Sequence, residues 1–100
     1  MKLITIVNAR AGLQKLSAQD LPIRSAWEVV KLIDECNVHL MFYGQQMQRR
    51  PSPEQIQELN EMEISGFDAR VKIRVPLAED LRLSAADIKA LEPFVEFEEV

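Results

Sequence analysis

The sequence predicts an α+β fold in which a small, mainly antiparallel sheet packs against a helical hairpin, within a single domain of residues 1–100. Three observations predict this arrangement. Between residues 25 and 50, apolar side chains recur every three or four positions, which indicates one long helix. Serine and proline follow directly and are expected to start a second helix. Apolar and charged residues then alternate in two later stretches, which indicates strands.

The N-terminal part is expected to hold a strand and a short helix. Residues Leu3 to Val7 are apolar and mostly β-branched, which predicts a short strand. Asn8 can then cap a helix whose Leu13 and Leu16 lie on one face.

The long helix is expected from Ser25, as its N-cap, to Arg50, because Pro51 disfavours helical geometry in the residue before it. At about 1.5 Å per residue it would be about 39 Å long. A compact domain of this size has a diameter of only about 33 Å, so the helix spans the domain or protrudes from it. Seven apolar residues lie on one seam of this helix: Ala26, Val29, Ile33, Cys36, Leu40, Tyr43 and Met47.

A second apolar set flanks this seam: Trp27, Val30, Met41 and Phe42. A helix that is apolar over more than half its circumference is either the central element of its domain or part of an oligomer interface, and the sequence leaves both open. Aromatic residues concentrate binding energy in interfaces. We therefore expect an interaction surface made of Trp27, Val29, Ile33, Leu40, Phe42, Tyr43 and Met47.

The next helix begins with a capping box. Ser52 is placed to cap it, Pro53 occupies its first position, and Gln55 can bond back to the cap. Because Pro51 joins the two helices so tightly, we expect an antiparallel helical hairpin.

The second half of the chain changes to a period of two. Residues 71–75 form one predicted strand, and residues 94–100 form the last. Between them, Ser84 and Asp87 resemble a capping box that opens a short helix. Arg74 alternates with apolar residues in one strand and Glu96 in the other, and opposite charges stabilise adjacent strands. The two strands are therefore predicted to be neighbours.

Side chains that act as nucleophiles, bases or metal ligands are few and scattered. His39 is the only histidine, and Cys36, three residues earlier, is the only cysteine. A zinc site would need further ligands, and the three glycines form no phosphate-binding cluster. We expect no enzyme, no cofactor and no metal. The candidate residues for binding an anion are Arg70, Lys72 and Arg74.

Charge and cysteine content also limit the partners. A net charge of −4 argues mildly against nucleic acid, whose binding would need the three basic residues above to cluster with Arg49 and Arg50. The single cysteine gives no sign of an oxidising compartment, and no apolar run is long enough to cross a membrane. The N-terminal apolar stretch is shorter than a signal peptide. We therefore expect an intracellular protein without a membrane partner.

Several blocks of sequence occur in a characteristic order. They are Asn8-Ala9, residues 21–27 leading into Lys31-Leu32-Ile33, residues 58–64, and residues 83–94. In this order the chain resembles a family of small hypothetical proteins encoded by tailed bacteriophages and prophages. The resemblance implies a place in the host cytoplasm or in the virion. That family has no established activity, so the resemblance supplies no catalytic residue.

These observations favour a non-enzymatic protein–protein interaction module that acts through the long amphipathic helix. It would be a small virion or assembly component, or a modulator of a host protein, with another protein or a second copy as partner. One alternative is a protein that sequesters a small molecule or nucleotide, holding its phosphates with Arg70, Lys72 and Arg74. A weak nucleic-acid binder is the other alternative.

Overall fold

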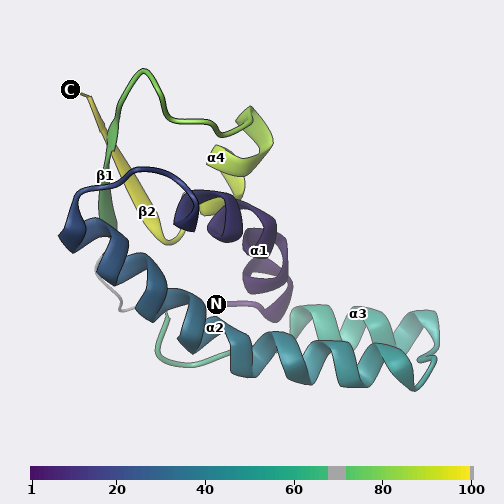
Figure 1. Cartoon of the computed structure of the whole chain (residues 1–100). Coiled ribbons are helices and arrows are strands. Elements are labelled where there is room, and N and C mark those ends of the chain that lie inside the picture. The colour runs from purple at the N-terminus through teal and green to yellow at the C-terminus, as the bar shows by residue number, and fades with distance from the viewer. Residues whose placement is uncertain (68–71, 100) are drawn as a thin grey trace.

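The computed structural model describes residues 1–67 and 72–99, which form four helices and a two-stranded sheet (Figure 1). The helix α1 packs against α2, α3 and α4, and α2 also contacts β1. The second half of α2 and the whole of α3 extend away from the sheet as an arm. In chain order the elements are α1 (Leu3–Ser17), α2 (Ile23–Gln48), α3 (Pro53–Glu61), β1 (Ile73–Leu77), α4 (Ala85–Leu91) and β2 (Val95–Glu99).

The sheet is parallel, so the prediction of a mainly antiparallel sheet is wrong. Ile73 lies opposite Val95 in the register of β1 and β2. The connection between the strands contains α4 and returns the chain to the end of the sheet where β1 starts, which is the crossover that parallel strands require. The prediction that the two strands are neighbours is confirmed. Arg74 lies opposite Glu96, and its Nε is 3.5 Å from Oε1 of Glu98.

The predicted N-terminal strand is also wrong, because residues 3–7 form the first turns of α1. The side chains of Leu3 and Ile6 continue the helical spacing of Leu13 and Leu16, and all four are buried in the core. Packing of this face outweighs the strand preference of the β-branched residues. The chain before the helix still makes one strand-like contact, an isolated antiparallel bridge from Lys2 to Glu63.

The long helix begins two residues earlier than predicted. Pro22 takes the cap position, and Ser25 lies inside α2, where its hydroxyl donates a 2.8 Å hydrogen bond to the backbone carbonyl of Arg74. This bond ties α2 to β1. The helix has 26 residues, so its length is about 39 Å. The molecule measures 46 × 25 × 18 Å, and α2 therefore accounts for most of its longest dimension.

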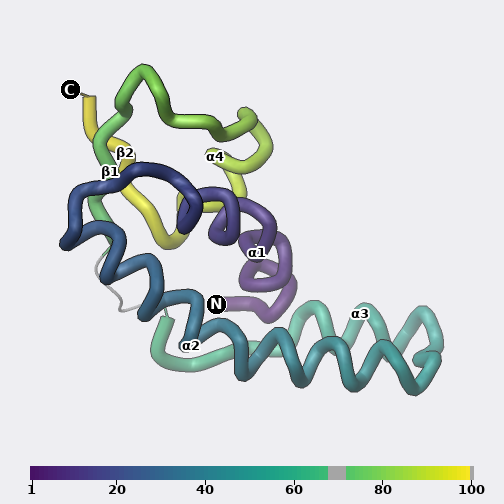
Figure 2. The backbone as a smooth tube through the Cα atoms, viewed as in Figure 1, coloured from purple at the N-terminus to yellow at the C-terminus, as the bar shows by residue number. Residues whose placement is uncertain are grey.

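The predicted cap at Asn8 is wrong, because Asn8 lies inside α1, but the local signals at the starts of α3 and α4 are confirmed. Ser52 and Gln55 form a complete capping box at α3, and Ser84 and Asp87 form another at α4. Between α2 and α3 the chain turns sharply, with Arg50 at a φ of 51° directly before Pro51. The predicted hairpin is confirmed as well, because α3 returns along the second half of α2 (Figure 2).

Candidate functional site

The seam predicted as an interaction surface is mainly the inner face of α2. Val29 is fully buried, so it cannot meet a partner while the chain is folded in this way. Ile33, Leu40 and Tyr43 are partly buried and pack against the core. Met47 lies near the end of the arm and is 37% exposed. The inner face thus serves mostly to hold α2 against the rest of the chain.

The opposite face of α2 carries a separate row of exposed apolar side chains, which we call the outer stripe. At 100° per residue its members fall within an arc of about 80°. Their side chains are from 47% to 89% exposed. The outer stripe consists of Ile23, Trp27, Val30, Val38 and Met41.

Sequence reasoning found only part of this stripe. Trp27 was among the predicted interaction residues, and Val30 and Met41 were placed beside the seam. Ile23 was missed because the helix was expected to begin at Ser25. Val38 was missed because it does not lie on the predicted seam. It is three residues before Met41, so the two side chains are neighbours on the exposed face. A search for a second apolar row on the predicted helix would have found Val38, whereas Ile23 would also have required the earlier helix start.

Two opposite charges interrupt the outer stripe at its centre. Asp34 lies between Val30 and Val38 on the same face, and Lys31 lies at its edge one turn earlier. Both side chains are exposed, and neither forms an ion pair within residues 1–67 and 72–99. The stripe therefore has two apolar halves with an acidic and a basic group between them.

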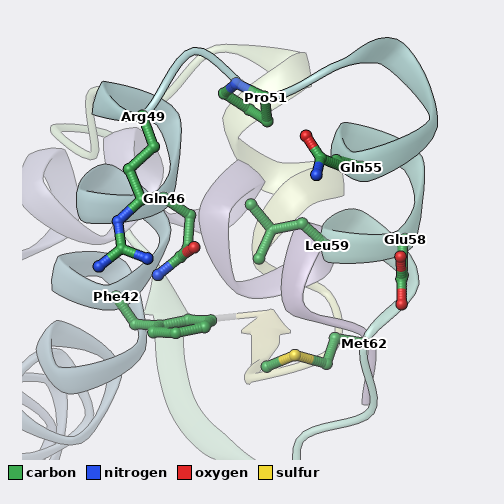
Figure 3. A pocket seen from close by; sticks show the side chains of 8 residues that line it. All are labelled: Phe42, Gln46, Arg49, Pro51, Gln55, Glu58, Leu59 and Met62. Carbon is green, nitrogen blue, oxygen red and sulfur yellow. The ribbon is translucent and has the colours of Figure 1, made fainter.

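A groove separates α3 from the second half of α2 (Figure 3). It has a volume of about 410 Å³. Phe42 and Leu59 project into the space from opposite helices, and Arg49 and Glu58 place opposite charges on its two sides. Its full lining is Phe42, Gln46, Arg49, Pro51, Gln55, Glu58, Leu59 and Met62.

The predicted anion-binding cluster is not assembled by the residues that can be placed. Arg74 is exposed but faces two acids, with Glu96 opposite it and Glu98 at 3.5 Å. Lys72 is exposed just before β1, and Arg70 lies outside the described residues. Because the neighbouring strand supplies carboxylates, the surface around Arg74 carries no excess of positive charge.

The remaining chemically distinctive residues contribute to packing. The ring of His39 meets the ring of Phe67 edge-on at 5.5 Å, and Phe67 in turn meets Phe94 at 6.1 Å. Cys36 is buried on the inner face of α2. Across residues 1–67 and 72–99, no group of three or more histidine, cysteine or carboxylate side chains is arranged to hold a metal ion.

The carboxylate of Asp87 has a shifted pKa. The ammonium group of Lys15 donates a 2.9 Å hydrogen bond to Asp87 and lowers the pKa of that carboxyl below its ordinary value. The backbone N–H and the hydroxyl of Ser84 act in the same direction. These bonds connect α1 to the start of α4, so Asp87 stabilises the junction of the two helices.

Comparison with known proteins adds no assignment. A scan against protein-family models finds no match, and neither a search of curated proteins nor one of solved structures finds any. Within the part of the chain that can be described, no helix is both long and apolar enough to cross a membrane.

Proposed function

We propose that this chain is a non-enzymatic protein–protein interaction module that binds its partner through the outer stripe of α2. The observation that carries the proposal is the stripe itself. Single exposed apolar residues are common on protein surfaces, but five on one face of a helix, with a tryptophan near one end, are typical of binding sites. Trp27 is 64% exposed, so its contact area is available to a partner.

The total surface of the chain supports the same proposal. A compact monomer of 11.5 kDa exposes about 5,800 Å² according to the usual scaling with mass. This chain exposes 6940 Å², an excess of about 1,100 Å². A standard protein interface removes about 800 Å² from each partner, so the excess is large enough to include one.

We further propose that the module comes from a tailed phage or prophage and acts in the host cytoplasm or in the virion. The support is the ordered set of sequence blocks that resembles small phage proteins. In that setting the partner is a virion or assembly component, or a host protein that the module modulates.

A retention experiment tests the interaction through the outer stripe. Wild-type chain is immobilised and exposed to a lysate of infected cells, beside the double variant Trp27→Glu/Met41→Glu. The matched control Gln14→Glu/Gln57→Glu adds the same charge at exposed positions of α1 and α3. We expect wild type and control to retain a partner that the stripe variant loses.

Two results would refute the proposal. In the first, the stripe variant retains the same proteins as wild type in the same amounts. In the second, wild type binds neither another protein nor a second copy of itself.

The groove between α2 and α3 favours a second candidate function, the binding of a small molecule. Its volume of about 410 Å³ lies within the range of about 300–1,000 Å³ of known ligand sites. A ligand panel in a thermal-shift assay tests this function, and Leu59→Trp should abolish any shift by filling the groove. No stabilisation at millimolar ligand would count against this candidate.

A further inference from the structure

We infer that the partner of the outer stripe is a second copy of this chain, with the two α2 helices antiparallel about a two-fold axis that lies between them, level with the midpoint of Lys31 and Asp34. This inference rests on the proposed function, because it names the partner of the same surface. The inference is based on the match between the stripe and an antiparallel copy of the same stripe. The stripe has two apolar halves and a charged centre, and an antiparallel copy presents those parts in reverse order.

The apolar halves match when the axis lies midway between positions 32 and 33. Trp27 and Val38 are then equally distant from the axis, so the indole of each copy meets the valine of the other. Ile23, which is 89% exposed, comes opposite Phe42 and next to Met41. Ile23 at one end of each stripe therefore lies beside apolar side chains at the other end of the partner's stripe.

The charges match in the same register. Lys31 of each copy lies opposite Asp34 of the other, which makes two symmetrical ion pairs from side chains that have no ion-pair partner in the described chain. A parallel pair through the same face would instead place Asp34 against Asp34 and Lys31 against Lys31. Because like charges in an interface are costly, the centre of the stripe selects the antiparallel arrangement.

The size of the contact sets its strength. From Ile23 to Met41 the stripe is about 27 Å long, and a helix is about 10 Å wide. One pair of helices therefore covers less than the standard area of about 800 Å² from each partner. We expect a reversible dimer that forms at micromolar chain concentration rather than an obligate one.

The test uses charge reversal at the two central residues. Light scattering or sedimentation is measured over a dilution series for wild type, Lys31→Glu, Asp34→Lys and the variant with both changes. Each single reversal creates two like-charge contacts in the dimer, so we expect its dissociation constant to rise by about tenfold or more. The double variant exchanges the charges and should associate like wild type.

A mixture of the two single variants makes the prediction more specific. In the mixed dimer, Glu at position 31 faces Lys at position 34, and native Lys31 faces native Asp34, so both contacts are attractive. The mixture should therefore form dimers at concentrations where each variant alone is monomeric. Lys31 and Asp34 are exposed, and circular dichroism of each variant should match wild type.

Two outcomes would overturn the inference. A wild-type dimer whose dissociation constant is unchanged by both single reversals contradicts the antiparallel arrangement. A wild-type chain that remains monomeric at every concentration contradicts the dimer. In that case the proposed function still stands if the retention experiment shows a different protein that the stripe variant loses, so the two failures can be told apart.

Discussion

Leu32→Ala and Trp27→Ala should have different effects on the free energy of unfolding, because the two residues lie on opposite faces of α2. Leu32 is fully buried between α2 and the core. Leu32→Ala removes its contacts and leaves a cavity, so we expect a loss of about 3 kcal/mol in the free energy of unfolding. For a domain of about 100 residues this loss lowers Tm by about 12–24 °C.

Trp27→Ala should have a much smaller effect on stability. The side chain is 64% exposed, and alanine is the better helix former. We expect the free energy of unfolding to change by less than about 1 kcal/mol, although the tryptophan side chain is larger than that of Leu32. Thermal unfolding is followed by far-UV circular dichroism at low chain concentration, so that self-association does not add to stability. Equal losses for the two variants would show that the inner and outer faces have been assigned wrongly.

Two further predictions concern the glycines of α1 and α2 and the ion pair between α1 and α4. Gly44→Ala should stabilise the chain by about 1 kcal/mol through helix propensity, since nothing lies within 4 Å of the added Cβ. Gly12→Ala should not stabilise the chain, because the added Cβ would lie 3.0 Å from Cγ of the buried Leu91. If urea unfolding shows the same increase in the free energy of unfolding for both variants, this packing is contradicted. Asp87→Asn should destabilise the chain at neutral pH. The carboxylate has a lowered pKa in the folded state, so its contribution is present above the ordinary value of 3.8 and is lost as pH falls through the folded pKa. The difference in Tm between wild type and Asp87→Asn should therefore shrink as the pH falls below about 4, and a difference independent of pH would exclude the ion pair with Lys15 as its cause.

Signals contained within a few residues predicted the structure well. A capping box needs only a hydroxyl and a carboxylate or amide three residues later, and both boxes form as the sequence indicates, at Ser52 and at Ser84. Helix starts without such a signal were less certain. At Ser25 a typical capping residue lies inside the helix, because its hydroxyl is used by the backbone of β1 instead.

Strand direction could not be read from the charge pattern. The alternation of Arg74 with apolar residues, and of Glu96 with apolar residues, has the same period in either direction along a strand. It therefore predicts that the strands are neighbours and says nothing about whether they are parallel. The direction depends on the path of α4, which is a property of the whole chain.

The position of the candidate site was missed for a related reason. Residues 3–7 were expected in a sheet, which left too little helix to cover the inner face of α2. With those residues in α1, Leu3 and Ile6 join the buried cluster that contains Val29 and Leu32. Most of the apolar seam is therefore buried within the chain, and the exposed apolar side chains lie on the opposite face of α2.

The described chain supplies no element that covers the outer stripe, whose side chains are 47% to 89% exposed. Covering a stripe about 27 Å long takes a helix of about 18 residues. Of the other helices in residues 1–67 and 72–99, α1 is the longest with 15 residues, and it is already packed against the inner face of α2. The helix α3 has 9 residues and lies along the arm, and α4 has 7 and packs on α1. Among the helices described, only a second α2 has both the length and the order of apolar and charged side chains to fit the stripe.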